Sequence, residues 1–464
     1  MKKLLLVFLS IGLGFFLSVQ TIVDKPALSK EQKDKPKNVI LLIGDGMGIG
    51  QMEIARLFEH GLEGRLFIET LPYTAIVHTS SSNNRVTDSA AGGTALAIGQ
   101  KTNNGMIGIT PNGKNKDSIL DSFKKDGKKT AIITTNSVTD ATPASFTASV
   151  NNRWADQEEI AKQQLSNKVD IIMGGGKKYF TRPDKRGIDL IDAYKNSGYT
   201  YISTADQLAK TNADKILGLF GETHLNFQLD RNYQKTAEPS LQEMTKKALD
   251  VLSKDEEGFF AMIEGGRIDH ASHSSDITGI WKETIAFDEV VKYCVEWANK
   301  RKDTLVVVAA DHETMGVSAT EAMDIKALKK IAVSPHYMAQ QLKKKKTSNN
   351  YTKKSIRKVF KDYAAINLSK EELTQLQTNQ MPKKGQVYRE QQIDWKIGAI
   401  IANHYHAGIL QSPIQQLSST GGHTSNMIVV FASGNGAEEF HGVLDNTDIP
   451  KKIASIMGYA LFNQ

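Results

Sequence analysis

The chain has 464 residues, of which 40% are hydrophobic and 23% are charged. This length and composition exclude a disordered protein and suit one large domain with an insertion, or two to three ordinary domains. The net charge is +7, but twelve Lys or Arg residues and no acidic residue lie between 326 and 361, so the rest of the chain carries −5. Because the basicity is local, no nucleic-acid partner is expected.

The N-terminus has the layout of a signal peptide. Lys2 and Lys3 precede an uncharged run that extends to about Val23. We predict a signal peptide over 1–22, although a run of this length would also suit an uncleaved anchor. A polar leader over 23–37 follows. The protein is therefore expected to be exported, to the periplasm or outside the cell, with no stable membrane span after cleavage. Cys294 is the only cysteine, which excludes an intramolecular disulfide.

Seven short apolar runs recur along the chain, each followed by a turn and a helix-like segment. Their hydrophobicity is continuous rather than alternating, which indicates strands covered on both faces. We therefore predict an α/β fold, a three-layer α/β/α sandwich with a large, mostly parallel central sheet. The predicted strands are 38–43, 74–78, 130–134, 169–173, 259–263, 304–309 and 427–431.

The segment 318–414 differs from the rest because it lacks strong strand runs and contains the lysine cluster. Ser369 and Glu372 have the spacing of a capping box. We predict an inserted, mainly helical subdomain, which could roof a site or cover a subunit contact, between two parts of the main domain, 38–317 and 415–464. The lysine cluster is interpreted as a solvated helical face. His404 and His406 are interpreted as surface or packing residues rather than metal ligands.

Acidic residues and imidazoles follow three of the predicted strands. In open α/β sheets, ligands bind beyond the carboxyl ends of the strands. Carboxylate oxygens and neutral imidazole nitrogens bind divalent metals, and cations would remove the repulsion between carboxylates gathered at one edge. These residues therefore predict a metal site: Asp45 after the first run, Glu264, Asp269, His270 and His273 after the fifth, and Asp311 and His312 after the sixth.

Ser89 is the candidate nucleophile. Small residues surround it, and an Ala-rich segment that resembles a helix start follows. A serine at a helix N-terminus lies in a positive field that favours both an alkoxide and a phosphate group. An ordinary helix cap formed by Asp88 or Ser89 is the alternative interpretation.

Six motifs together resemble the metal-dependent alkaline phosphatases, in that family's order and over most of the chain. They are Asp-Gly-Met-Gly at 45–48, Asp-Ser-Ala-Ala-Gly-Gly-Thr-Ala at 88–95, Asp-Ala-Thr-Pro-Ala at 140–144, Glu-x4-Asp-x3-His at 264–273, Ala-Asp-His-Glu at 310–313 and Gly-Gly-His-Thr at 421–424. The resemblance implies hydrolysis of small phosphate monoesters to an alcohol and inorganic phosphate through a phosphoserine. It also implies two Zn²⁺ ions, one Mg²⁺ ion and a homodimer.

The resemblance also implies a role for each matching residue. Ser89 resembles the nucleophile, Arg153 the phosphate clamp, and Asp88 the residue that orients Arg153. The implied metal ligands are Asp45, Asp311 and His312 for one zinc, Asp269, His273 and His423 for the other, and Asp45, Thr142 and Glu264 for magnesium. Asp140 and His270 are expected behind these ligands, Asp140 acting through water.

Asp140 and His270 form a mixed pair. Bacterial relatives often pair Asp with Lys at these positions and animal relatives have His at both, so the metal of the third site and the role of His270 stay open. A sulfatase is disfavoured because Cys294 lies in Cys-Val-Glu-Trp-Ala rather than in a Cys/Ser-x-Pro-x-Arg setting. A phosphodiesterase would usually offer Thr as the nucleophile and lack Arg153. A catalytically silent binding protein would lack a ligand or the nucleophile.

Overall fold

The computed structural model describes residues 35–460 except 184–186, 188, 347, 349 and 378–391. The predicted signal peptide, 1–22, and most of the predicted leader, 23–37, lie outside the described residues. Within the described chain, no helix has both the length and the apolar character needed to cross a membrane.

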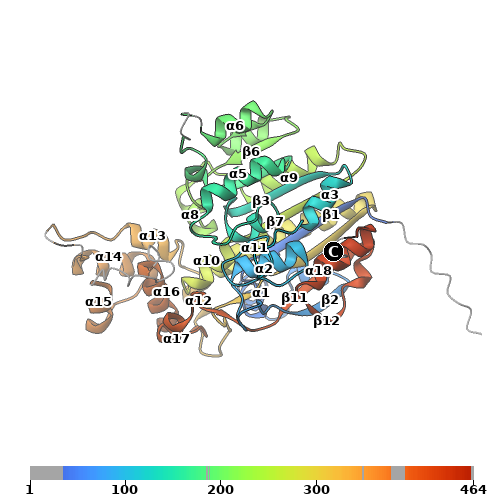
Figure 1. The fold of residues 1–464 in the computed structure, drawn as a ribbon. Helices are drawn as coiled ribbons and strands as arrows, with labels where there is room; N and C mark the ends of the chain where they lie inside the picture. The colour runs from blue at the N-terminus through green and yellow to red at the C-terminus, as the bar shows by residue number, and fades with distance from the viewer. Residues whose placement is uncertain are drawn as a thin grey trace, which may run out of the picture. The chain divides into compact units, whose positions relative to one another are not determined.

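A ten-stranded sheet forms the centre of the described structure (Figure 1). Within this sheet, as far as the chain is described, only β11 runs antiparallel to its neighbours, β2 and β8, and the other pairs are parallel. This arrangement confirms the predicted mostly parallel sheet. The strand order is β12 (Gly442–Asp445), β2 (Tyr73–His78), β11 (Ile428–Gly434), β8 (Thr304–Ala309), β1 (Asn38–Gly44), β7 (Phe259–Gly265), β3 (Lys129–Ser137), β4 (Ile171–Gly175), β6 (Ile216–Leu219) and β5 (Thr200–Ile202).

Helices cover both faces of this sheet, so every residue of β1, β7 and β8 is buried. Burial on both faces explains why these runs are continuously apolar. One set of helices packs around α11 (Ile277–Arg301). It comprises α1 (Ile49–His60), α8 (Gln228–Gln234), α9 (Leu241–Leu252), α10 (Arg267–His273) and the 3₁₀ helix η1 (Phe67–Thr70), and α7 (Ala205–Lys210) contacts α9. A second set is α2 (Ser89–Ile98), α3 (Ile119–Lys125), α4 (Ala141–Ser145) and α18 (Asp448–Met457).

Shorter elements complete this α/β part of the chain. The helix α5 (Gln157–Asn167) contacts α6 (Leu190–Asn196), and α6 packs on β5. Two 3₁₀ helices, η2 (Lys177–Tyr179) and η4 (Ala437–Glu439), follow β4 and β11. The two-residue strands β9 (Glu313–Thr314) and β10 (His423–Thr424) pair with each other, so the chain before the long helical segment meets the chain after it.

Helices occupy most of the described chain between β9 and β10. They are α12 (Ile325–Leu328), α13 (Pro335–Gln340), α14 (Lys353–Ala364), α15 (Lys370–Gln377), α16 (Gln392–His404) and α17 (Ser412–Leu417). Their apolar core includes Ile54 and Phe58 of α1 and Trp281 of α11. The helical segment therefore packs against the main sheet's own helices. Its treatment as a separate subdomain, 318–414, stays a prediction.

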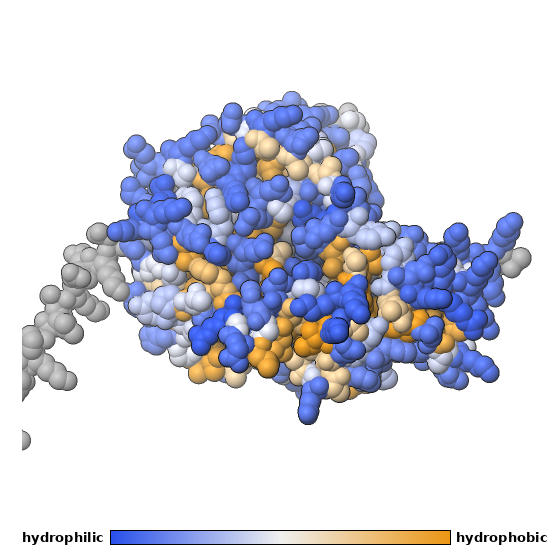
Figure 2. Space-filling view, turned by 180° about the vertical axis from the view of Figure 1, so that it is seen from behind, coloured by the Kyte–Doolittle hydropathy of each residue, from blue (hydrophilic) through white to orange (hydrophobic). Residues whose placement is uncertain are grey.

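Two local predictions in this segment are confirmed. Glu372 accepts a hydrogen bond from the Ser369 amide at 2.8 Å, and the Glu372 amide donates to Ser369 Oγ at 3.1 Å, which completes the capping box. In α14, Lys353, Lys354, Arg357, Lys358 and Lys361 are exposed, whereas Ile356, Val359 and Phe360 are buried. The lysine-rich run is thus a solvated helix face here, and Figure 2 shows a largely hydrophilic surface over α14 and α15.

Candidate active site

The candidate metal ligands gather where three parallel strands end. β1 lies between β7 and β8, and its Ile43 pairs with Glu264 on one side and with Ala309 on the other. Since parallel strands end at the same edge of a sheet, the segments that follow them meet there. Asp45, α10 and Asp311 follow β1, β7 and β8, respectively, and are buried.

Asp269, His273 and His423 form the first cluster of metal-ligating groups. Nε2 of His273 lies 3.2 Å from Asp269 Oδ2 and 3.1 Å from Nε2 of His423. The Nδ1 atoms lie 2.9 Å from backbone carbonyls, those of Gly421 and Thr87. A carbonyl only accepts, so both Nδ1 atoms carry hydrogen and both Nε2 lone pairs point at the cluster. This is the tautomer that metal-binding histidines need.

Asp45, Asp311 and His312 form the second cluster. Nε2 of His312 lies 3.2 Å from Asp311 Oδ2 and 3.5 Å from Asp45 Oδ1. Its Nδ1 lies 3.2 Å from Thr314 Oγ1, and that hydroxyl donates to Asp269 Oδ1 at 2.6 Å. Because Thr314 gives its hydrogen to Asp269, it accepts from His312. Thr314 therefore fixes the His312 tautomer and links the two clusters.

Several oxygens at the site are buried and have no hydrogen-bond partner among the described residues. They are Asp45 Oδ1, Asp311 Oδ2, Glu264 Oε1 and Thr142 Oγ1. Burial raises the pKa of Asp311 to about 7 and that of Glu264 to about 8, and it raises the pKa of Asp45 well above its usual range. Buried oxygens are normally paired, so bound cations would fit these orphaned atoms.

The predicted nucleophile lies beside the second cluster. Ser89 is the first residue of α2, and its Oγ lies 3.1 Å from Nε2 of His312. Asp88 caps the same helix by accepting from the Ala91 amide at 2.9 Å, and it also accepts from the Gly105 amide at 2.9 Å. The helix-cap alternative is therefore true of Asp88, while the Ser89 hydroxyl contacts the His312 imidazole of the second cluster.

Arg153 is buried and lies between two carboxylates. Its Nη2 donates to Asp140 Oδ1 at 2.7 Å, and its Nη1 lies 3.7 Å from Asp88 Oδ2. Asp140 is thus the nearer of the two partners, whereas the sequence pointed first to Asp88. Coulombic attraction to Arg153 lowers the pKa of Asp140 although burial opposes it.

A third cluster contains a residue that the sequence did not single out. Asp140, His224 and His270 each place a ligand-type atom within 4.8 Å of the others. The rings of His224 and His270 pack edge to face with centroids 4.5 Å apart. His224 lies in the loop after β6, outside every motif, and nothing in the neighbouring sequence identifies it as part of the site.

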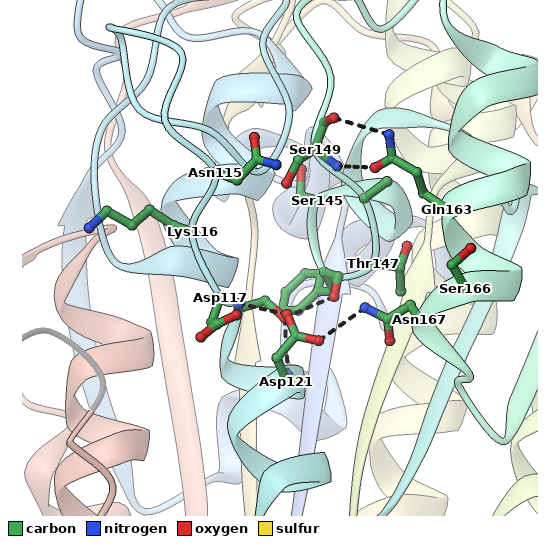
Figure 3. A pocket seen from close by; sticks show the side chains of 13 residues that line it. Asn115, Lys116, Asp117, Asp121, Ser145, Thr147, Ser149, Gln163, Ser166 and Asn167 are labelled. Carbon is green, nitrogen blue, oxygen red and sulfur yellow. Dashed lines mark hydrogen bonds between the residues drawn. The ribbon is translucent and has the colours of Figure 1, made fainter.

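A separate polar pocket of about 530 Å³ lies beside the C-terminal end of α4 (Figure 3). Hydrogen bonds connect the residues that line the pocket. The Asn167 side chain donates to Asp121 at 3.0 Å, and the Ser149 backbone amide donates to the Gln163 side chain at 2.7 Å. None of its lining residues belongs to the three clusters. The pocket is therefore distinct from the candidate active site.

The chain is similar to known proteins over nearly its whole length. The alkaline phosphatase family model matches residues 36–459. Alkaline phosphatase 4 of Bacillus subtilis (strain 168) is 32% identical over 450 residues, which cover 94% of this chain and 91% of that protein. The crystal structure of Thermus thermophilus alkaline phosphatase matches with a TM-score of 0.80 and 26% identity, covering 91% of this chain and 92% of that one.

A further solved structure is a variant of the alkaline phosphatase from the Antarctic bacterium TAB5. In this variant an aspartate replaces a histidine and Mg is bound in the M3 site. It matches with a TM-score of 0.64 and 29% identity, covering 93% of this chain and all of that one.

The fold and the site define a hydrolase with metal-binding clusters at the edge of an α/β/α sheet. The chain belongs to the alkaline phosphatase family, the enzymes that hydrolyse phosphate monoesters.

Proposed function

We propose that the enzyme transfers the phosphoryl group of a monoester to Ser89 and then to water, with two Zn²⁺ ions and one Mg²⁺ ion bound. The observation that carries this proposal is the contact between Ser89 Oγ and Nε2 of His312, at 3.1 Å. This contact supports the proposal because the hydroxyl of the first residue of α2 lies next to a candidate metal ligand, in the positive field of a helix N-terminus.

The donor sets support an assignment of metals to clusters. Asp269, His273 and His423 would hold one zinc, and Asp45, Asp311 and His312 the other, because zinc prefers mixed nitrogen and oxygen ligands. Asp45, Glu264 and Thr142 would hold magnesium through oxygen alone. The Mg in the M3 site of the TAB5 variant favours magnesium as this third ion. Bound together, such ions ionise a nucleophile and stabilise the entering and leaving oxygens of a phosphoryl transfer.

The remaining groups bind and orient the substrate. Arg153 has two nitrogens on one side of a planar fork and can hold two phosphoryl oxygens at once. Asp140 and Asp88 fix the direction of that fork. Ser89 Oγ attacks the phosphorus opposite the alcohol, which leaves. Water then attacks the phosphoserine from the side that the alcohol has left, and Ser89 Oγ departs on the opposite side.

Replacement of the nucleophile tests this proposal. Ser89→Ala, loaded with zinc and magnesium to the level of wild type, should lose at least about 10³-fold in kcat for a nitrophenyl phosphate. A rapid quench should trap phosphoserine on the wild type and none on the variant. Full activity in Ser89→Ala would contradict the phosphoserine route, and full activity after chelation would contradict the need for metal.

Substrate comparison separates this enzyme from its alternatives. Wild type should turn over a phosphate monoester far faster than the matching diester or sulfate ester. The monoester dianion carries one more negative charge than either alternative, and Arg153 with bound cations would attract that charge. A diester rate equal to the monoester rate would favour a phosphodiesterase.

Three statements about the whole protein belong to the same proposal. The enzyme is exported after cleavage of residues 1–22, it forms a homodimer, and the helical segment 318–414 covers the site or a subunit contact. N-terminal sequencing of the exported protein and its mass in solution test the first two.

A further inference from the structure

Glu313 is a buried carboxylate beside the site that the proposed mechanism does not use. It follows His312 in the sequence and begins β9. In β10 it pairs with Thr424, which follows His423. Glu313 is only 3% exposed and belongs to none of the three clusters. It therefore neighbours one candidate ligand from each of two clusters without being a ligand of either.

Donors from both sides of the helical segment 318–414 converge on the Glu313 carboxylate. Its Oε2 accepts from Thr424 Oγ1, from the Gly316 amide at 3.2 Å and from the Asn426 side chain at 3.4 Å. Its Oε1 accepts from the Val317 amide at 3.3 Å. Gly316 and Val317 precede the helical segment, whereas Thr424 and Asn426 follow it. One carboxylate therefore joins the chain before this segment to the chain after it.

A third part of the chain reaches Glu313 through Gln51 of α1. The side-chain nitrogen of Gln51 donates to Glu313 Oε1 at 3.3 Å and to Ser272 Oγ, in α10, at 3.2 Å. The loop between β1 and α1 also packs against Glu313, because an added Cβ at Gly48 would lie 2.1 Å from its Cγ. This loop carries Asp45, so the segments that carry ligands of both clusters meet at one side chain.

These contacts bear on the spacing between the first and second clusters. The rings of His312 and His423 stack with centroids 3.6 Å apart, although the two residues belong to different clusters. Their backbones are joined by β9 and β10, which share only two residue pairs. So short a two-stranded ladder is marginal by itself. The hydrogen bond from Thr424 to Glu313 crosses this ladder directly beside both imidazole-bearing residues.

We propose that Glu313 is a positioning residue that fixes His312 relative to His423, so that metal binding at both clusters depends on it. The identity of the ions rests on the proposed function, and zinc is the probe. Removal of a residue that orients metal ligands typically weakens metal binding about 10–100-fold. The distinctive expectation is that one residue, itself not a ligand, affects two clusters at once.

Two backgrounds allow the zinc affinity of each cluster to be measured separately. His423→Ala removes a ligand of the first cluster and leaves the second complete, and His312→Ala does the reverse. In each background, competition with a chromophoric chelator gives the zinc Kd, first with Glu313 intact and then with Glu313→Ala. This measurement needs no turnover of substrate.

Two further variants are made in each background. Thr424→Val keeps the side-chain shape and removes one donor to Glu313, so it tests the proposal even if Glu313→Ala does not fold. Glu283→Ala is the matched control. Glu283 is also buried, at 7% exposed, and accepts from the Gln228 amide at 2.6 Å, but it belongs to no cluster.

Glu313→Ala should raise the zinc Kd about 10–100-fold in both backgrounds. Thr424→Val should raise it about three- to ten-fold in both, the usual effect of one hydrogen bond. Glu283→Ala should leave both Kd values unchanged, even where it lowers the Tm.

An unchanged Kd in either background, for Glu313→Ala or for Thr424→Val, would overturn the proposal. Equal weakening by Glu283→Ala would also overturn it, because the effect would then be a general loss of stability. If wild type bound no zinc, the metal assignment of the proposed function would fall together with this inference. If wild type bound two zinc ions and Glu313→Ala bound them equally well, this inference alone would fall.

Discussion

At the scale of single residues, the acceptor beside each histidine decides which ring nitrogen faces the site. Thr87 and Gly421 contribute only backbone carbonyls, yet these fix the tautomers of His423 and His273. Thr314 does the same for His312 through a hydroxyl. Loss of such a partner would weaken metal binding without removing any ligand.

Removal of one histidine ligand tests the first cluster. His423→Ala deletes one of the three proposed protein ligands, and we expect it to lose about one zinc ion per chain, because two ligands rarely hold zinc tightly. Elemental analysis after dialysis measures the loss. His404→Ala, which removes a histidine that contacts only Glu372 among the hydrogen-bond partners of the described chain, is the control and should keep all its metal. Retention of all zinc by His423→Ala would contradict the assignment.

The sequence predicted Asp45, Glu264, Asp311 and their neighbours because each follows an apolar run that becomes a strand. A local pattern is enough there, since strand ends share one edge. It could not predict His224. His224 lies near Asp140 because β3, β4 and β6 are neighbours in the sheet and because Gly175 has no side chain to keep the loop after β6 away. Neither feature leaves a signal in the sequence around position 224.

At the scale of elements, helix α16 lies directly against the segment that carries a candidate zinc ligand. Trp395 of α16 stacks on the His273 ring, with centroids 5.4 Å apart and planes 11° from parallel. The same helix brings Gly398 against the chain after α10, where an added Cβ would lie 1.7 Å from the Ser274 carbonyl oxygen. The helical segment therefore supports the site from outside the sheet.

This contact reverses a common rule about glycine. Gly→Ala inside a helix usually stabilises by about 1 kcal/mol. Gly398→Ala should instead lower the free energy of unfolding by about 1–3 kcal/mol, because α16 must shift to admit the methyl group. Thermal unfolding of the metal-loaded protein measures this change, with the partly exposed Ala399→Ser as control. A higher Tm for Gly398→Ala would contradict the close contact.

The long strands were predictable and the short ones were not. β1, β3, β7 and β8 are buried on both faces and appear as apolar runs, whereas β5 has three residues, β6 contains a glycine, and Val443 of the edge strand β12 is 62% exposed. A short or half-exposed strand depends on its neighbours in the sheet, and its own residues carry little signal.

At the scale of the whole molecule, the buried carboxyl groups couple stability to pH and to metal. Burial raises the pKa of Glu264 from 4.5 to about 8, so the folded state holds this proton more tightly than the unfolded state. Its contribution to stability is complete below pH 4.5 and is lost as the pH rises through about 8. Burial lowers the pKa of His312 from 6.5 to about 3, so this residue favours the folded state more as the pH rises, opposite to Glu264. This contribution to stability is fully present above pH 6.5 and no longer changes there.

The metal-free protein should therefore lose Tm as the pH rises from 6.5 to 8. A bound cation replaces the proton, so the metal-loaded protein should change less. Glu264→Gln cannot ionise and should reduce the metal-free slope. The remaining slope is due to Asp276, whose pKa burial raises to about 8, and to Asp311 and Glu283, whose pKa values burial raises to about 7. Differential scanning calorimetry at matched ionic strength measures both slopes. Equal slopes for wild type and Glu264→Gln would contradict the role of Glu264.

The position of His423 has a consequence for the order of events during synthesis. His423 follows His273 by 150 residues, yet both imidazole rings lie beside the Asp269 carboxylate. When Asp269 and His273 have left the ribosome, the whole helical segment must still be translated before His423, the third residue of the cluster, is synthesised. The nascent chain therefore cannot complete this cluster before residue 423 has been synthesised, so the cluster forms late in synthesis.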